Sequence, residues 1–442
     1  MRQPLLPADL PEISYGIRQI VSKGFEREKL GYPVIWENIG DPVQKGVQLP
    51  AWMKEVIAEK VQDNNTFGYC DSKGLLRTRE FVAERTNQHR GYQITPDDIT
   101  FFNGLGDAIA RFYGLLAKDA QVLMPSPTYP AHTGAEKLHI GREPLTYPLH
   151  PENEWLPDTE EVRHLVEKNP DVCCLLIINP DNPTGMVYPK PVLKELVEIA
   201  REYDLFIVAD EIYENLVYEG EMVRLAEVIG DVPALVMKGI SKEVPWPGSR
   251  CGWIEYYNRA SDPEFRKLCE RIDQCKMTEV CSTTLPQAVL PDILSHKEHE
   301  EFLAERKRAL IKKIAMLRAR VQQVDGVECS GAKGAFYAAL HTNTDFNISK
   351  IRSVLLPDDQ QKLYEKWAAD LAGKQPDLHL VYYLLAGAGV CTVPLSGFNS
   401  KIPGIRITLL EQHIDQFEQM LDQLMNGLAS VFNKKESLVQ AG

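Results

Sequence analysis

The segment VCCLLIINPDNPTG, residues 172–185, joins a run of apolar β-type residues to a loop that two prolines and a glycine fix. The run predicts a buried strand, and the loop places the side chain of Asn182 at the edge of a sheet. Similar runs alternate with helical patterns between residues 99 and 257, which is typical of a mostly parallel α/β sheet. These runs are Ile99 to Phe102, Val122 to Met124, Leu205 to Ala209, Ala234 to Met237 and Cys251 to Tyr256.

Short segments rich in polar residues, glycine and proline follow most of these runs directly. In open α/β sheets, ligands bind outside the carboxyl ends of the strands, so the segments are expected to meet at one site. They are Asn103-Gly104, Pro125 to Tyr129, Asn179 to Gly185, Asp210 to Tyr213 and Ser241-Lys242.

The chain changes character after the sheet region. Residues 298–324 have apolar positions at helical spacing, which predicts a long amphipathic helix leading out of the sheet. Strand-like runs follow at residues 334–340, 390–394 and 405–409, with an amphipathic segment near residues 360–371. We expect a second, smaller α+β domain there.

The composition excludes several classes of protein. With 442 residues and a formal net charge of −13, the chain favours more than one domain and argues against nucleic acid or an anionic membrane as partner. It has no run of about 18 apolar residues, and residues 1–40 lack the apolar core of a secretory signal.

The 9 cysteines are scattered without a CxxC pair, so we expect reduced thiols and a cytoplasmic location. The HKEH at 296–299 lacks a nearby third ligand, so we expect no metal site.

Three motifs occur in an order that is found in one known family: NPDNPTG at 179–185, ADEIY at 209–213 and SKEVPWPGSRCGW at 241–253. On these motifs the chain resembles the class I/II aminotransferases of fold type I, which use pyridoxal 5′-phosphate (PLP). The resemblance extends from NIGDP at 38–42 to GIRIT at 404–408. It implies a mostly parallel seven-stranded sheet with helices on both faces, a smaller α+β domain, and a homodimer with shared active sites.

The same resemblance suggests how the chain is divided. We expect residues 1–50 to form an N-terminal arm and part of the small domain, residues 51–300 the large PLP-binding domain, and residues 301–442 the small C-terminal domain.

The resemblance also implies which residues carry the chemistry. Lys242 would hold the cofactor as a Schiff base and move the proton of the substrate's Cα atom. Asp210 would keep the pyridine nitrogen protonated. Tyr213 and Asn182 would hydrogen-bond the phenolic oxygen of the ring, and Tyr129 would stack on its face.

For the cofactor's phosphate, the resemblance points to Gly104, Leu105 and Gly106 at the start of a predicted helix, where backbone N–H groups bind anions. Arg250 would add charged donors, and Tyr69 would reach the phosphate from the neighbouring subunit. Related families usually have a hydroxyl residue where Gly106 stands. Phosphate binding is therefore expected to depend more on the backbone and Arg250.

For the substrate, Arg406 resembles the arginine that binds the α-carboxylate, because its planar fork matches two carboxylate oxygens. Gly40 would contribute a backbone N–H to the same carboxylate, and Asn182 would lie beside it. The text SYGIRQIVSKG at 14–24 is similar to the bacterial glutamate–pyruvate (alanine) aminotransferase branch. In that branch a tyrosine and an arginine, here Tyr15 and Arg18, lie over the active site.

The leading hypothesis is therefore ping-pong transfer of an α-amino group, with alanine/pyruvate and glutamate/2-oxoglutarate as the substrate pairs. Two features differ from the alanine branch: an insertion at about residues 342–379, and the sequence around Phe398, which is expected near the substrate side chain. Alternatives are an aminotransferase for aromatic or branched-chain amino acids and a PLP-dependent C–S β-lyase. A sensor domain fused to a DNA-binding module and an inactive scaffold also remain, although the charge argues against the first and Lys242 against the second.

Overall fold

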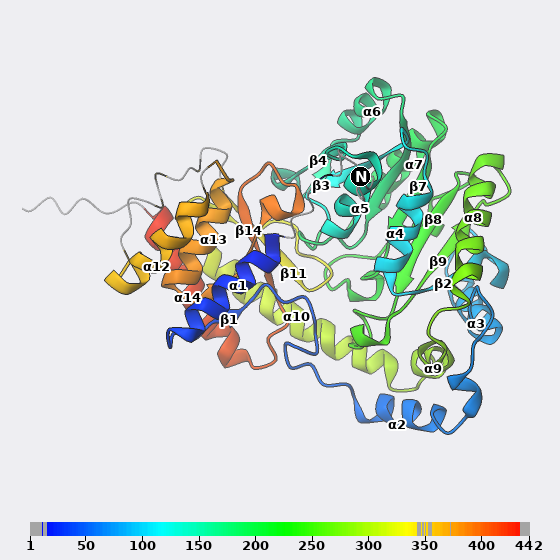
Figure 1. Ribbon diagram of the computed structural model, residues 1–442, viewed down its shortest axis with the longest axis horizontal. Coiled ribbons are helices and arrows are strands. Elements are labelled where there is room, and N and C mark those ends of the chain that lie inside the picture. The colour runs from blue at the N-terminus through cyan, green and yellow to red at the C-terminus, as the bar shows by residue number, and fades with distance from the viewer. Residues whose placement is uncertain are drawn as a thin grey trace, which may run out of the picture.

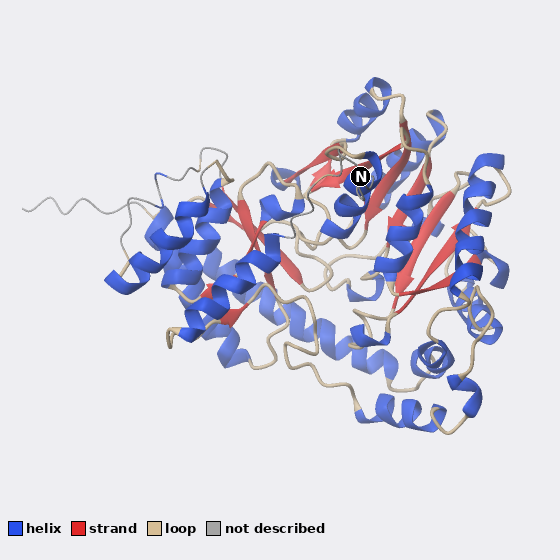
Figure 2. Cartoon of the chain, viewed as in Figure 1, coloured by secondary structure: helices blue, strands red, loops and turns tan. Residues whose placement is uncertain are grey.

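The protein is described by a computed structural model that covers residues 11, 16–342, 346, 349, 351, 356–371 and 373–433. A larger and a smaller sheet organise these residues, and helices pack against both (Figure 1). Figure 2 shows the strands of the larger sheet as a fan on the right and those of the smaller sheet on the left.

Within the described ranges, the larger sheet has eight strands in the order β2-β9-β8-β7-β6-β3-β4-β5. All neighbours from β8 to β4 are parallel, whereas β9 is antiparallel to β2 and β8, and β5 is antiparallel to β4. The bounds are β2 Ile99–Asn103, β3 Gln121–Ser126, β4 Thr146–His150, β5 Leu156–Pro157, β6 Val172–Ile178, β7 Phe206–Asp210, β8 Ala234–Gly239 and β9 Cys251–Tyr257.

The mostly parallel sheet is confirmed, but it has one strand more than the seven expected. The additional strand is β5, whose two residues extend the edge of the sheet beside β4. Two residues are too few to produce the alternating pattern by which a strand is recognised in a sequence.

Helices cover both faces of the larger sheet, as expected, because alternate strand residues enter two different cores. On β6, Leu176 and Ile178 pack in one core with Phe112, while Leu175 and Ile177 enter the other. The first core includes residues of α4 (Leu105–Leu115) and α8 (Pro263–Glu279); the second includes residues of α3 (Leu76–Asn87), α6 (Thr159–Lys168), α7 (Lys190–Glu202) and α9 (Thr284–Leu294). Helix α5 (Pro130–Ile140) follows β3, and α2 (Ala51–Lys60) packs on α9.

The smaller sheet is antiparallel, with the order β10-β11-β14-β13 among the described residues. A short parallel pair, β1 with β12, joins the N-terminal region to the C-terminal one. The bounds are β1 Ile35–Trp36, β10 Val327–Glu328, β11 Tyr337–Thr342, β12 Val390–Cys391, β13 Val393–Pro394 and β14 Gly404–Thr408. The helices of this region are α1 Gly16–Lys29, α12 Asp358–Ala368, α13 Pro376–Gly387 and α14 Ile414–Phe432.

The long helix expected near residues 298–324 is α10, which spans His299–Val321 and runs from the larger sheet towards the smaller one (Figure 1). The proposed insertion at 342–379 contains α12 and the start of α13, while part of it lies outside the described residues. The division at residues 50 and 300 stays a prediction. Among the helices of the described ranges, none combines the length and the apolar character needed to cross a membrane.

Candidate active site

A cavity of about 310 Å³ lies at the carboxyl ends of the central strands, between the two sheets. The segments that follow β3, β6, β7 and β8 all reach it, together with residues from the smaller sheet. The cavity wall includes Asn38, Gly40, Leu105, Gly106, Tyr129, Asn182, Asp210, Tyr213, Lys242, Arg250, Tyr337, Phe398 and Arg406.

Lys242 enters the cavity three residues after the end of β8. Its Nζ atom donates a hydrogen bond to the carbonyl oxygen of Gly40 over 3.0 Å. A side chain at position 40 would collide with the hydroxyl of Tyr337, so the close approach requires glycine there. Arg306 of α10 donates to the carbonyl oxygen of Lys242 over 2.8 Å and thereby fixes its backbone.

Asp210 is the last residue of β7 and is buried at the cavity wall. Its Oδ1 atom accepts a hydrogen bond from the backbone N–H of Ile212 at 3.1 Å, and its Oδ2 atom lies 3.4 Å from Nε2 of His132. The other ring nitrogen of His132 lies 3.2 Å from the hydroxyl of Tyr113. The carboxylate is therefore oriented from both sides.

Tyr213 lies three residues further along and donates a hydrogen bond to the hydroxyl of Tyr337 over 3.3 Å. Burial, and the neighbouring Tyr337 hydroxyl, raise the pKa of Tyr213 well above its usual value. The phenol therefore stays protonated at neutral pH, and its single proton, donated here to Tyr337, would have to turn to be donated into the cavity.

The loop after β6 is fixed by its own side chains. Asp181 Oδ2 accepts hydrogen bonds from the Thr184 hydroxyl at 2.6 Å and the Thr184 backbone N–H at 3.1 Å. Burial raises the pKa of Asp181 to about 7, partly offset by those hydrogen bonds. Next to it, the Oδ1 atom of Asn182 is buried and has no hydrogen-bond partner among the described residues. Its amide is thus available to a polar ligand in the cavity.

The first turn of α4 faces the cavity with Leu105 and Gly106. Gly104, directly before the helix, has φ +80°, and a side chain there would collide with the guanidinium of Arg250. Arg250 is itself in the left-handed region with φ 52°, a conformation that is uncommon for non-glycine residues and often marks a functional site. The helix N-terminus and this guanidinium together form a place for an anion.

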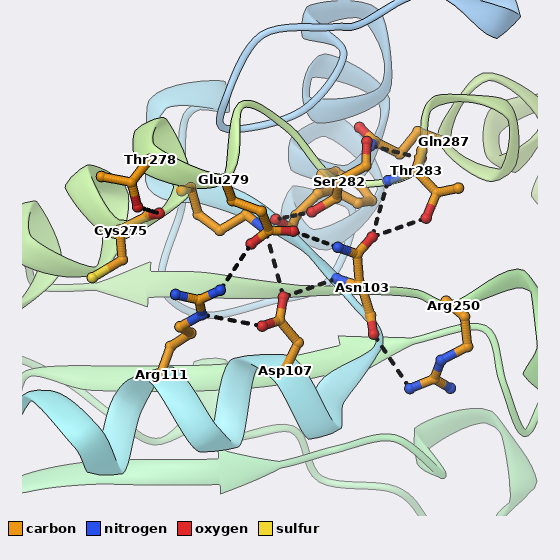
Figure 3. Close-up of polar contacts among 12 residues, drawn as sticks. Asn103, Asp107, Arg111, Arg250, Cys275, Thr278, Glu279, Ser282, Thr283 and Gln287 are labelled. Carbon is orange, nitrogen blue, oxygen red and sulfur yellow. Dashed lines mark hydrogen bonds and ion pairs between the residues drawn. The ribbon is translucent and has the colours of Figure 1, made fainter.

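A polar cluster behind this turn holds it in position (Figure 3). Asn103, the last residue of β2, donates its side-chain amide to Glu279 and accepts hydrogen bonds from Thr283. Its carbonyl oxygen accepts from Arg250 over 3.3 Å. Figure 3 shows these side chains converging on Asn103 between α4 and the α8–α9 connection. The turn before α4 is therefore tied both to Arg250 and to α8.

Arg406 of β14 forms the opposite wall. Its guanidinium donates to the carbonyl oxygen of Asn38 over 2.6 Å. The guanidinium carbon lies 4.5 Å from the ring centroid of Tyr337 and 5.3 Å from that of Phe398. Its Nε atom is buried and has no hydrogen-bond partner among the described residues, so the cation keeps a donor for a carboxylate.

Three expected site residues, Tyr69, Arg18 and Gly104, are absent from the wall of this cavity, although Gly104 directly precedes α4. Tyr69 is absent from its wall and is 86% exposed. Arg18 is exposed on α1 and also absent from the wall. Tyr15 lies outside the described residues.

The family described as aminotransferase class I and II matches residues 34–424 of the chain, which include both walls of the cavity. The chain belongs to this family. This aminotransferase is similar to an uncharacterised aminotransferase of Methanocaldococcus jannaschii, with 47% identity over 96% of this chain and 98% of that one. It is also similar to a glutamate-pyruvate aminotransferase of Escherichia coli K12, with 30% identity over 74% and 80% of the two chains.

Solved structures agree with this assignment. An alanine aminotransferase from Pyrococcus furiosus superimposes on this aminotransferase with a TM-score of 0.82 at 28% identity, covering 96% of this chain and 99% of that one. An Escherichia coli aminotransferase gives a TM-score of 0.82 at 26% identity, with 98% and 100% covered.

The aminotransferase depends on PLP, and the residues of the cavity fit this cofactor. The first turn of α4 offers backbone N–H groups that have no partner within the helix, next to the guanidinium of Arg250, as an anionic phosphate needs. The unpartnered amide oxygen of Asn182 offers a hydrogen-bond acceptor to a polar group bound in the cavity. Lys242 is the one lysine among the residues that line the cavity in the described part of the chain.

Sequence reasoning did not single out three residues that shape the site. His132 contacts Asp210, Tyr337 contacts Tyr213 and Arg406, and Asn38 accepts from Arg406. A signal existed for His132, which lies one helical turn after Tyr129 and so shares its face. A signal also existed for Asn38, which begins the NIGDP motif. Tyr337 had none, because it stands in a strand-like run where a core aromatic is the ordinary expectation.

Proposed function

We propose that this PLP-dependent aminotransferase exchanges the α-amino group between alanine and pyruvate, with glutamate and 2-oxoglutarate as the second pair, by a ping-pong mechanism. The supporting observation is the pair of rings, Tyr337 and Phe398, whose centroids lie 4.5 and 5.3 Å from the guanidinium carbon of Arg406. They limit the space beside the cation that would hold the α-carboxylate, which favours a small side chain. The similarity to relatives named for alanine or for glutamate and pyruvate points to the same substrates.

In this proposal PLP supplies an electron sink for the electron pair that remains when the Cα–H bond of the amino acid breaks. Lys242 would hold the cofactor through its amine and then carry the proton that leaves Cα. Asp210, oriented by His132 and by its own loop, would keep a proton on the pyridine nitrogen. The buried phenol of Tyr213 and the amide of Asn182 would donate hydrogen bonds to the ring oxygen.

The remaining residues would bind and orient. The backbone at Gly104, Leu105 and Gly106 would receive the phosphate together with Arg250, and Tyr129 would pack on the ring face. Arg406 would bind the α-carboxylate with its free Nε donor and its terminal nitrogens.

We also propose a homodimer in the cytoplasm. The exposed phenol of Tyr69, near the exposed Phe67, would be covered by a second subunit and reach that subunit's phosphate site. The free thiols of the cysteines fit a reducing compartment. Tyr15 and Arg18 would close over the substrate.

The experiment is a panel of half-reactions: the cofactor-loaded enzyme is mixed with single amino acids, and the loss of the cofactor's visible absorbance is timed. Alanine and glutamate are expected to react fastest. Faster reaction of aromatic or branched-chain amino acids would overturn the substrate assignment. Release of pyruvate and ammonia from cystine or cystathionine, without transfer, would favour a C–S β-lyase.

A further inference from the structure

A second group of charged side chains lies behind the active site and takes no part in the chemistry proposed above. At its centre is Lys238 of β8, four residues before Lys242 and only 3% exposed. Its Nζ atom lies 3.3 Å from Glu214 Oε2, 3.5 Å from Glu211 Oε2 and 3.7 Å from Glu255 Oε2. One buried ammonium therefore faces the buried carboxylates of Glu211 and Glu255 and the half-buried carboxylate of Glu214.

Two of these carboxylates belong to the segment that follows β7. In that segment Asp210 and Tyr213 face the cavity, and the residue after each, Glu211 and Glu214, faces Lys238. The backbone N–H of Glu211 also donates to the carbonyl oxygen of Met237 over 2.9 Å. The same short segment thus contributes Asp210 and Tyr213 to the cavity wall and Glu211 and Glu214 to the contacts with Lys238.

Each carboxylate is held by further partners. Glu211 accepts from the backbone N–H of Leu225 at 2.7 Å, and Glu214 accepts from Arg224 at 2.7 Å. Glu255 of β9 accepts hydrogen bonds at 2.8 to 3.0 Å from three side chains, Thr86, Trp253 and Tyr257. Glu255 is therefore held in place by three hydrogen bonds. Lys238 connects it to Glu211 and Glu214 in the segment after β7.

The charges within the cluster depend on one another. Burial alone would raise the pKa of Glu214, but Lys238 and Arg224 lower it to about 2, so this carboxylate is ionised. Burial raises the pKa of Glu211 to about 7 despite Lys238. Burial opposes the charge on Lys238, yet the three glutamates raise the pKa of Lys238 above its usual value. The ammonium is the group that allows the carboxylates to be buried together.

We propose that Lys238 is a positioning residue. Its buried ammonium holds the segment that carries Asp210 and Tyr213 in a fixed position relative to the end of β8, which leads to Lys242. This inference rests on the proposed roles of Asp210, Tyr213 and Lys242, but not on the choice of substrate. Without the ammonium, Glu211 and Glu214 lose their shared counter-ion, and the segment moves relative to the cofactor site.

The test is the substitution Lys238→Met, which keeps an unbranched side chain of nearly the same length and removes the ammonium group. The resting, cofactor-loaded enzyme is titrated with pH and its visible absorbance recorded without substrate, and kcat and KM are then measured. We expect the midpoint of the titration to shift by about half a pH unit or more. We expect kcat to fall roughly 10- to 100-fold with little change in KM, because small misplacements of reacting groups have effects of this size.

Two further variants separate positioning from loss of folding. The double variant Lys238→Met with Glu211→Gln replaces the buried carboxyl group that loses its counter-ion by a neutral amide and keeps the acceptor for Leu225, so its thermal stability should recover. The shifted titration and low kcat should persist in it, because Glu214 still lacks its ammonium. Lys313→Met is the matched control: that lysine is also buried and donates to the carbonyl oxygen of Leu409 over 3.0 Å, away from both segments. It should leave the titration unchanged.

A double variant with wild-type kcat and wild-type titration would overturn the inference, as would the same result for a folded Lys238→Met. The substitution Tyr213→Phe shows which proposal has failed. If it leaves the titration unchanged, the proposed role of Tyr213 is wrong. If it shifts the titration while both Lys238 variants do not, only the positioning role of Lys238 is wrong.

Discussion

The two walls of the cavity are built in different ways. On the larger sheet, Asn182, Asp210 and Lys242 follow three neighbouring strands, β6, β7 and β8, so their positions are set by the sheet itself. On the opposite wall, Arg406 lies on an antiparallel strand and is held by Asn38, far away in the sequence. The first wall presents an amide, a carboxylate and an amine, and the second presents a cation close to two aromatic rings. We infer that the first wall governs chemistry and the second governs recognition, which three substitutions can test; a fourth tests stability on the side of the larger sheet.

The largest effect is expected for Lys242→Ala on the first wall. Removal of the amine would take away both the link to the cofactor and the group proposed to carry the Cα proton. The rate of amino-group transfer should therefore fall by roughly 10³-fold or more. Single-turnover absorbance with glutamate measures it, and thermal unfolding confirms that the variant is folded. A variant that loses binding of the amino acid but keeps its rate at saturation would break the division between the walls.

On the second wall, Arg406→Lys keeps the charge but loses the planar fork. KM for amino acids should rise roughly 30- to 100-fold, because a paired, charge-assisted hydrogen bond is lost, while kcat changes much less. Initial rates over a range of alanine concentrations measure the split. A fall in kcat alone, with KM unchanged, would show that this arginine acts on the chemistry instead.

A smaller and more selective effect is expected for Phe398→Ala. Opening the space beside Arg406 should favour the larger substrate. The ratio of kcat/KM for leucine to kcat/KM for alanine should therefore rise about 10-fold, the usual scale for adding or removing apolar contacts. Phe417→Ala, a buried phenylalanine of α14 away from the cavity, is the control for loss of volume. Equal ratios in the two variants would remove Phe398 from the recognition wall.

The smallest effect concerns stability on the side of the larger sheet. Burial raises the pKa of Glu136 to about 7, although its carboxylate accepts a hydrogen bond from the Val122 backbone N–H at 2.9 Å. The folded protein therefore keeps this proton to a higher pH than the unfolded chain does. The resulting stability is complete below about pH 4.5 and is lost as the pH rises through 7.

Urea unfolding at pH 5 and pH 8 tests this for Glu136→Gln. Between these values the wild type should lose about 2 kcal/mol more of its unfolding free energy than the variant, because glutamine does not titrate. Identical pH dependence of the two proteins would place the pKa of Glu136 near its usual value.

The sequence predicted the core of the fold because buried parallel strands are continuous apolar runs; β6 was placed at Val172–Ile178 to the residue. It did not predict β4, where Pro148 interrupts the β-type pattern of Thr146–His150, or the two-residue β5. Both lie at the edge of the larger sheet, where pairing rather than local pattern decides the structure.

The same contrast applies to the two walls. Residues such as Asp210 and Lys242 could be proposed from their place directly after strands. The contact of Tyr337 with Arg406 could not, because it depends on the register of β11 against β14, which pairs Ala339 with Arg406 and puts Tyr337 on the cavity side. Contacts between residues that are far apart in the sequence were the ones that could not be predicted, whatever the residue types.

The hydrogen bond from Arg406 to Asn38 joins residues 368 positions apart. A ribosome makes the chain from its N-terminus, so the larger sheet is complete long before Arg406 has been added. During that interval the nascent chain carries Asn182, Asp210 and Lys242 of the first wall without Arg406 of the second. The hydrogen bond between Arg406 and Asn38 can therefore form only after almost the whole chain has been made, whatever the order in which the two sheets fold.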